Sequence, residues 1–181
     1  MRGTGQTPKP LWLAETEKLW PAWKLEGAEL AAGKIDATVL AVKLQEDAGI
    51  DIVSDGEQSK ASFQAYATDR LSGIEPIAPK PGERHTRENA AFKTFYPGGA
   101  HPGSAQAKWA CTGPIRYTGA AAVVADIANL RRALQELHPV DAFMPSVSPS
   151  SCAGMMENRY YQSDEEHVLA VAEAMRRGLI S

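Results

Sequence analysis

Apolar residues recur at helical spacing in two stretches of the second half of the chain. A helix over 121–137 is the clearest expectation, because its apolar residues fall on one stripe of a 3.6-residue period. A second helix is expected over 162–177, where Ser163 and Glu166 have the spacing of a capping box. The stripe of the first helix consists of Val123, Val124, Ile127, Leu130, Leu134 and Leu137.

The first half of the chain has a weaker helical pattern. Residues 14–33 are apolar at helical spacing, but Pro21 and Gly27 interrupt them, so we expect two short pieces. Asp36 is the expected N-cap of the next helix, and Gly49 is placed where a C′ glycine terminates it. A further helix is expected from about Ser59 to Leu71.

Short apolar runs lie between these helices and predict strands at 50–54, 109–117 and 140–149, the second broken by Gly113-Pro114. Strands that alternate with helices of crossover length are typical of parallel βα units. The runs are mostly apolar rather than alternating, as in strands covered on both faces. Neither a GxGxxG fingerprint nor a Walker loop follows the first strand, which leaves a (β/α) barrel or part of one.

The chain is short for a complete barrel. An eight-unit barrel takes about 250 residues, whereas this chain has 181 residues and three or four expected strands. We therefore expect an α/β fold with roughly the first half of a TIM-like barrel and parallel strands. Residues 1–181 would form one incomplete domain, interrupted by an irregular excursion at about 75–108 that is rich in proline and glycine.

Composition and charge exclude several classes of function. The formal net charge is −3 and no cluster of Lys or Arg occurs, which argues against nucleic-acid binding. No apolar run approaches the roughly 20 residues of a membrane-spanning helix. The two cysteines lie in unrelated contexts without histidine at ligand spacing, so we expect a reducing cytoplasm and no metal site in this chain.

The candidate chemistry is concentrated in "AGIDIVSDGEQSK", residues 48–60. Asp55, Gly56 and Glu57 directly follow the expected strand, and strand ends face the active site in a parallel barrel. Glu57 could accept charge-assisted hydrogen bonds from a ligand ammonium. The alternative is a solvated turn whose carboxylates cap the next helix. Pattern alone favours this second interpretation.

Other candidates have weaker signals. Ser148, with Thr112 and Ser146, is a hydroxyl at a strand-end turn that could line a pocket, although ordinary turn chemistry is the simpler interpretation. Cys152 lacks a paired base and is a poor candidate nucleophile. The four histidines are scattered and are expected at the surface: His85, His101, His138 and His167.

Four segments together resemble a known family. They are "LWLAETEKLWPAWKLEG", "AGIDIVSDGEQSK", "TGPIRYTGAAAVVADIANLRRAL" and "FMPSVSPSSCAGMMENRYYQSDEEHVLAVAEAMR". In this order they resemble the cobalamin-independent methionine synthases, specifically the short single-barrel members often labelled methionine synthase II. The resemblance covers most of residues 8–177.

The resemblance implies a fold, a reaction and ligand-binding residues. The fold would be the catalytic barrel that transfers a methyl group from 5-methyltetrahydrofolate to homocysteine, whose thiol zinc holds as thiolate. The glutamate of the family's Asp-Gly-Glu turn falls on Glu57, which would hold the homocysteine ammonium, with Asp55 beside it. Gly5 matches the family's Ile-Gly-Ser turn, where Gln6 replaces the serine.

The departures from the family limit the expected activity. The family's zinc ligands come later than the last matched helix, and residues 178–181 do not resemble the family's continuation. Truncation or a frameshift would explain both features, so we expect this chain to be inactive alone and to bind no zinc. Two alternatives stay open: a barrel that alkylates another thiol, or a non-enzymatic fragment that self-associates or pairs with a partner through an open barrel edge.

Overall fold

The computed structural model describes residues 7–16, 22–61, 63–77 and 108–180 of the chain. These residues divide into two compact units. Of the described residues, unit 1 holds 7–16, 22–61 and 121–146, and unit 2 holds 63–77, 108–120 and 147–180. The expected single barrel domain over residues 1–181 stays a prediction.

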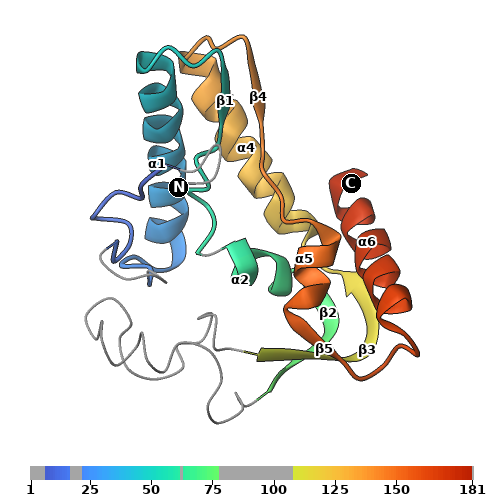
Figure 1. Cartoon of the computed structure of the whole chain (residues 1–181). Helices are drawn as coiled ribbons and strands as arrows, with labels where there is room; N and C mark the ends of the chain where they lie inside the picture. The colour runs from blue at the N-terminus through green and yellow to red at the C-terminus, as the bar shows by residue number, and fades with distance from the viewer. Residues whose placement is uncertain (1–6, 17–21, 62, 78–107, 181) are drawn as a thin grey trace, which may run out of the picture. The chain divides into compact units, whose positions relative to one another are not determined.

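Unit 1 contains a pair of parallel strands covered by helices (Figure 1). Helix α1 (Gly27–Asp47) leads into strand β1 (Ile52–Ser54), and helix α4 (Ala120–Glu136) leads into strand β4 (Asp141–Phe143). Strands β1 and β4 pair in parallel, with Val53 opposite Ala142. This is the βα arrangement expected from the sequence, and α4 has nearly its expected bounds.

A small apolar cluster holds unit 1 together. Three fully buried side chains pack in this cluster: Val42 of α1, Val53 of β1 and Ala133 of α4. Leu134, Leu137 and Ala142 pack against them. The stripe predicted for α4 is thus partly used, because Leu130 is buried whereas Val124 is 56% exposed.

Helix α1 begins earlier than the sequence predicted. Asp36 is not its N-cap: the helix starts at Gly27 and continues through residue 36 without a break. Its end is as expected, because Gly49 has a φ of 76° and donates its N–H to the Glu46 carbonyl at 2.8 Å. The helical expectation is wrong for the described residues 14–16 and 22–26, where Ala14 and Trp23 form an antiparallel bridge. Residues 17–21 lie outside the described residues.

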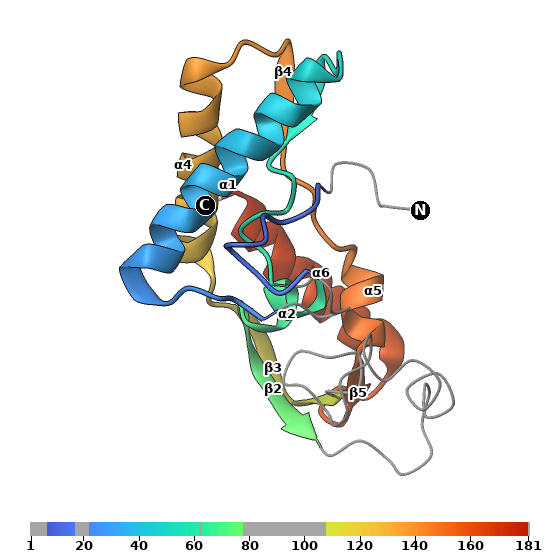
Figure 2. The same ribbon diagram turned by 90° about the vertical axis from the view of Figure 1, so that its left-hand side faces the viewer.

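Unit 2 is built on a three-stranded sheet of order β2-β3-β5 (Figure 2). After the short helix α2 (Phe63–Thr68) come strands β2 (Leu71–Ile77) and β3 (Lys108–Tyr117). Helix α5 (Pro149–Gly154), strand β5 (Met156–Asn158) and helix α6 (Asp164–Ile180) complete it. Strand β5 pairs with β3 in parallel, and α6 packs against α5 and β3.

Strands β2 and β3 form an antiparallel ladder, which corrects the expectation of parallel strands only. The sequence missed β2 because Gly73 and Pro76 are unusual within strands, but β2 is an edge strand, where proline is tolerated. Gly73 has a φ of 81° at an irregularity in the register, where an added Cβ would lie 2.5 Å from the Pro114 carbonyl oxygen. This bulge lets β3 continue through Gly113-Pro114. The described residues show partial sheets and no closed barrel.

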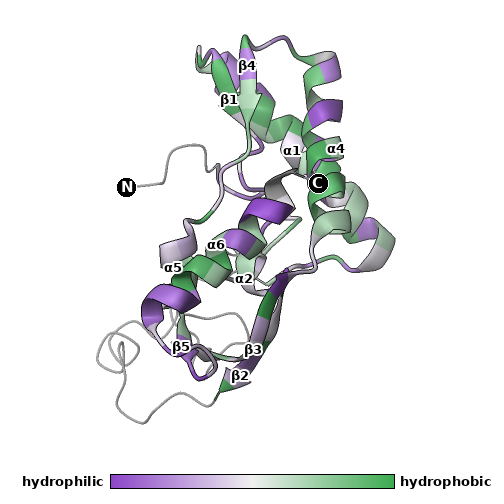
Figure 3. Cartoon of the chain, turned by 90° about the vertical axis from the view of Figure 1, so that its right-hand side faces the viewer, coloured by the Kyte–Doolittle hydropathy of each residue, from purple (hydrophilic) through white to green (hydrophobic). Residues whose placement is uncertain are grey.

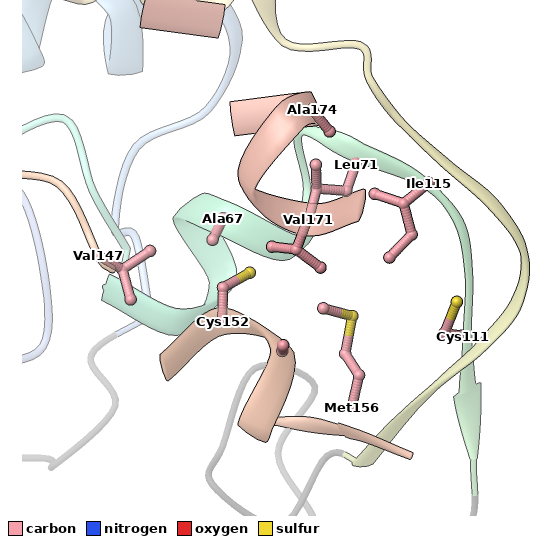
Figure 4. Packing of buried hydrophobic residues seen from close by; sticks show 10 residues of the cluster. Ala67, Leu71, Cys111, Ile115, Val147, Cys152, Met156, Val171 and Ala174 are labelled. Atoms are coloured by element: carbon pink, nitrogen blue, oxygen red, sulfur yellow. The ribbon is translucent and has the colours of Figure 1, made fainter. Parts of the chain in front are cut away.

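The interior of unit 2 is apolar (Figure 4). Side chains from α2, β2, β3, α5, β5 and α6 meet in one cluster, in which Cys111, Cys152 and Val171 are fully buried. The other buried members are Ala67, Leu71, Ile115, Val147, Ala153, Met156 and Ala174. Of the excursion expected at about 75–108, residues 75–77 belong to β2 and Lys108 to β3, and residues 78–107 lie outside the described residues.

Helix α6 confirms its predicted cap. The Glu166 N–H donates to the Ser163 hydroxyl at 3.1 Å. Polar and apolar residues alternate along α6 as the banding in Figure 3 shows. Gly178, assigned by sequence to a foreign tail, is helical and buried, and an added Cβ would lie 2.5 Å from the Tyr117 ring. No helix in the described ranges is long and apolar enough to cross a membrane.

Candidate ligand-binding corner

The acidic turn after β1 is a tight and unusual piece of backbone. Gly56 and Glu57 both have positive φ, 62° and 57°, and Glu57 is the one non-glycine with positive φ among the described residues. The Glu57 N–H donates to Asp55 Oδ1 at 3.0 Å, which closes an Asx turn. A left-handed glutamate costs about 1–2 kcal/mol, and such strain concentrates at functional sites.

Helix α1 fixes the strand end from which this turn starts. The Gln45 side chain donates to the Ser54 carbonyl oxygen at 3.0 Å and accepts from the Ser54 N–H at 3.0 Å. Gln45 thereby pairs with the backbone of β1 as a neighbouring strand would. The Ser54 hydroxyl in turn accepts from the Gly56 N–H at 3.1 Å. The start of the turn is therefore held on both sides by buried hydrogen bonds.

The N-terminal segment closes over the turn. Thr7 donates its N–H to the Gly56 carbonyl at 3.2 Å, and Gln58 Nε2 donates to Thr7 Oγ1 at 2.8 Å. A Cβ at position 56 would lie 2.4 Å from Thr7 Oγ1 and 2.6 Å from the Ala41 Cβ. Glycine is therefore required at position 56 both for its φ and for this close approach.

Lys60 links the turn to the end of β4. Its side chain is 4% exposed, its Nζ donates to the Pro145 carbonyl oxygen at 2.5 Å, and it lies 3.9 Å from Glu57 Oε1. The carboxyl ends of the two parallel strands are thus joined by one buried cation. This is the edge of a parallel sheet where ligands are usually bound.

Asp55 is enclosed rather than open to a ligand. The residue is 2% exposed, and its Oδ2 is buried with no hydrogen-bond partner in the described part of the chain. Burial raises the pKa of Asp55, and the nearby Lys60 ammonium opposes this shift. Asp126 on α4, also buried, adds a smaller upward contribution to the same pKa. Asp55 therefore shapes the turn and its charge, and its predicted ligand contact stays a prediction.

The carboxylate of Glu57 has unused acceptor capacity. Within the described residues it accepts no hydrogen bond, and its one ion pair, with Lys60, is 3.9 Å long. Its side chain is 17% exposed, so solvent or a small ligand reaches it. A strained, partly exposed carboxylate with free lone pairs can accept hydrogen bonds from a ligand ammonium.

A second lysine lies against the same turn. Lys9 Nζ donates to the Glu57 carbonyl oxygen at 3.0 Å and lies 5.7 Å from the centre of the Trp23 ring. Burial lowers the pKa of Lys9 to about 8, although the carboxylates of Glu57 and Asp55 oppose the shift. Two ammonium groups and two carboxylates therefore share this corner of unit 1.

The remaining predicted site residues are placed differently. Gly5 and Gln6 lie outside the described residues, and Thr7 is the first described residue at the turn. Ser148 belongs to unit 2, where it is exposed and caps α5 by accepting from the Ser151 N–H at 3.2 Å. The turn-chemistry interpretation of Ser148 fits this geometry, and its predicted role in ligand binding stays a prediction.

The histidines and cysteines offer no metal site in the described ranges, where no group of three or more His, Cys, Asp or Glu residues could hold a metal ion. His138 is exposed as expected, but His167 is not: it is 3% exposed and stacks on Tyr161 with 5.8 Å between ring centres. His85 and His101 lie outside the described residues. Burial raises the pKa of Cys152 to about 11, which keeps it a protonated thiol.

Sequence reasoning missed the residues that hold the corner together. Gln45 and Lys60 are polar residues that are 7% and 4% exposed, and their partners lie 9 and 85 positions away in the sequence. One local signal was present. Thr38 and Gln45 are seven residues apart, so they share the face of α1 that carries Ala37, Ala41 and Val42. Polar residues on an apolar face indicate a buried polar network.

The fold and this corner define a mixed α/β protein with a polar site at the carboxyl ends of parallel strands. No protein-family model matches the chain. A methionine synthase of Sulfolobus acidocaldarius is 37% identical over 70 residues, 39% of this chain and 21% of that protein. A methionine synthase of Sulfurisphaera tokodaii is 32% identical over 75 residues, 41% of this chain and 22% of that protein.

A solved structure covers far more of the chain. The B12-independent methionine synthase from Shewanella sp. W3-18-1, in complex with selenomethionine, matches 97% of this chain with a TM-score of 0.70 and 28% identity. The match spans 46% of that protein. The sequence and the fold are thus similar to those of B12-independent methionine synthases, in agreement with the family that the sequence motifs predicted. The chain spans less than half of the solved relative, and the alignments span about a fifth of the curated ones.

Proposed function

We propose that unit 1 supplies the amino-acid-binding corner of a methionine-synthase-like methyltransferase, in which Glu57 receives the ammonium group of homocysteine. The observation that carries the proposal is the state of Glu57. It is held with a positive φ at the end of β1, and its carboxylate accepts no hydrogen bond from the described residues. The relation to a B12-independent methionine synthase in complex with selenomethionine supports an amino acid as the ligand.

For the complete methyl-transfer reaction we expect zinc and a folate methyl donor. The described residues do not fit zinc, because no suitable ligand group occurs among them and the two described thiols are buried, with pKa values raised by that burial. The chain's own contribution is to bind and orient the amino acid. The absence of zinc from the purified chain is tested by elemental analysis, and stoichiometric zinc would contradict it.

Calorimetric titration with L-homocysteine and L-methionine tests the role of Glu57. Loss of a charge-assisted hydrogen bond of about 1.5–3 kcal/mol predicts a roughly 10–100-fold weaker affinity in Glu57→Gln. Glu165→Gln, on the exposed first turn of α6, is the matched control and should bind as the wild type does. Equal affinities of Glu57→Gln and wild type, or no binding by the wild type, would overturn the proposal.

A second candidate function, assembly with another copy of the chain, is favoured by exposed apolar side chains in unit 1. Ile52 on β1 is 54% exposed, Phe143 on β4 is 43% exposed, and Val140 beside β4 is 80% exposed. Two short strands that present apolar side chains are suited to association. Size-exclusion chromatography with light scattering should show a dimer that Val140→Asp with Phe143→Ser converts to a monomer. A monomeric wild type would exclude this assembly.

A further inference from the structure

We propose that His167 makes residues 158–167 of unit 2 an acid-sensitive latch, which holds the start of helix α6 on strand β3 while the imidazole is neutral and opens when it is protonated. The latch consists of the loop before α6 and the first turn of that helix. It lies in unit 2 and is independent of the function proposed for Glu57.

The loop and the first turn of α6 form one hydrogen-bonded piece. The Asn158 side-chain oxygen accepts from the Tyr161 N–H at 3.0 Å. Asn158 Nδ2 donates to the carbonyl oxygens of Tyr161 and Ser163, at 3.1 and 3.2 Å. The Ser163 hydroxyl accepts from the Glu166 N–H at 3.1 Å and so caps the helix. We therefore expect the loop and the first turn to move together.

Tyr161 attaches this piece to β3. Its hydroxyl accepts a hydrogen bond from the Ile115 N–H at 3.0 Å. Ile115 lies between Cys111 and Arg116, where the ladder with β2 is irregular, so a side chain here supplies the acceptor that a strand would otherwise give. The His167 ring stacks on the Tyr161 ring, with 5.8 Å between centres and 18° between planes. His167 thereby supports the tyrosine that bridges the loop to β3.

The surroundings of His167 Nε2 make this support depend on a proton. His167 is 3% exposed, and its Nε2 is buried without a hydrogen-bond partner in the described part of the chain. In a neutral imidazole the unpaired nitrogen can be the one without a proton. An imidazolium has a proton on both nitrogens, so Nε2–H would be a buried donor without an acceptor. Protonation therefore favours an open state in which water reaches the ring.

The charges around the ring act in the same direction. Burial lowers the pKa of His167, and the Asp164 carboxylate of the same helical turn opposes this shift. Helix α6 packs against α5 and β3. These elements carry the thiols of Cys152 and Cys111, which stay neutral because burial raises their pKa values, and the exposed cation of Arg116. Among the described residues of unit 2, no buried carboxylate could serve as the counter-ion of an imidazolium.

Amide hydrogen exchange tests the latch locally. Between pH 7 and 5.5, the protection factor of the Ile115 N–H should fall about threefold or more, within the limit of about tenfold per pH unit for one proton. The Thr118 N–H, which donates to the Arg70 carbonyl oxygen at 2.8 Å in the same unit, is the control amide and should keep its protection. Parallel losses at both amides, or no loss at Ile115, would overturn the proposal.

Two variants assign the effect to one histidine. His167→Phe keeps a flat ring beside Tyr161 but cannot be protonated, so the Ile115 protection factor should be the same at pH 7 and 5.5. His138→Gln, at an exposed position of unit 1, is the matched control and should show the wild-type loss. A His167→Phe variant that still loses protection refutes the latch. If His167→Phe does not fold, NMR titration of wild-type His167 decides, because a pKa at or above the usual value of about 6.5 would refute it as well.

Discussion

The two units of this chain differ in what they bury. Unit 2 packs an almost purely apolar interior, in which Thr68 and His167 are the buried polar residues within the described ranges. Unit 1 buries eight polar or charged residues around a smaller apolar cluster. They are Thr38, Gln45, Ser54, Asp55, Gln58, Ser59, Lys60 and Asp126.

The difference indicates a division of tasks. Burying a polar group is unfavourable unless it is hydrogen-bonded, and burying a charge is more so. In unit 1 such groups are concentrated around the turn after β1, where two buried acceptor atoms have no partner in the described part of the chain: Asp55 Oδ2 and Gln58 Oε1. His167 Nε2 in unit 2 is in the same state. We infer that unit 2 contributes mainly stability and that the polar interior of unit 1 is retained for ligand binding.

The largest expected effect tests the stability side of this comparison. Met156→Ala removes a 7% exposed side chain from the cluster of unit 2 and should lower the free energy of unfolding by about 2–5 kcal/mol. Leu169→Ala on α6, where the side chain is 62% exposed, is the control and should change it by less than about 0.5 kcal/mol. Urea denaturation measures both. Equal effects would mean that this cluster is not a packed core.

The next effect tests the rigid turn of unit 1. Gly56→Ala places a methyl group against Thr7 and Ala41 at a position with positive φ, and it should destabilise the protein by about 3 kcal/mol. Gly49→Ala has a similar φ of 76° but no atom within 4 Å of the added Cβ, so it should lose only about 1 kcal/mol. Similar losses in the two variants would show that Thr7 does not close over the turn.

How far the sequence predicts this structure depends on how local each signal is. Gly49, the Ser163–Glu166 cap and the stripe of α4 depend on residues within a few positions, and all three were identified. The start of α1 was misplaced because Asp36 is a good N-cap residue in an exposed helical position. The acidic turn was found because strand, glycine and carboxylates are contiguous. Lys9 and Gln45 were missed because only the folded chain brings them to it. Lys60 is near the turn in the sequence, but its partner Pro145 is 85 positions away.

A smaller effect distinguishes a structural serine from a ligand-binding one. Ser148→Ala removes the cap of α5 and should cost about 1 kcal/mol of unfolding free energy. Ser148→Asp, which keeps a capping oxygen, should restore most of that loss. The affinity for L-methionine should be the same in both variants and the wild type. A weaker affinity in a folded Ser148→Ala variant would return Ser148 to the ligand-binding residues that the sequence predicted.

The smallest expected effect concerns the buried carboxyl group of unit 1 and appears as a pH dependence. Because burial raises the pKa of Asp55 above its usual 3.8, the folded protein binds this proton more tightly than the unfolded chain does. Its contribution to stability is therefore full below pH 4 and is lost as the pH rises through the raised pKa.

Asp55→Asn keeps the Oδ1 acceptor for the Glu57 N–H but cannot ionise, so its unfolding free energy should fall less over this range. Asp51→Asn, exposed just before β1, is the control and should follow the wild-type profile. Urea denaturation between pH 4 and 7 measures these profiles. Parallel profiles of wild type and Asp55→Asn would mean that Asp55 is solvated, so that unit 1 would not bury this carboxyl group in a polar interior.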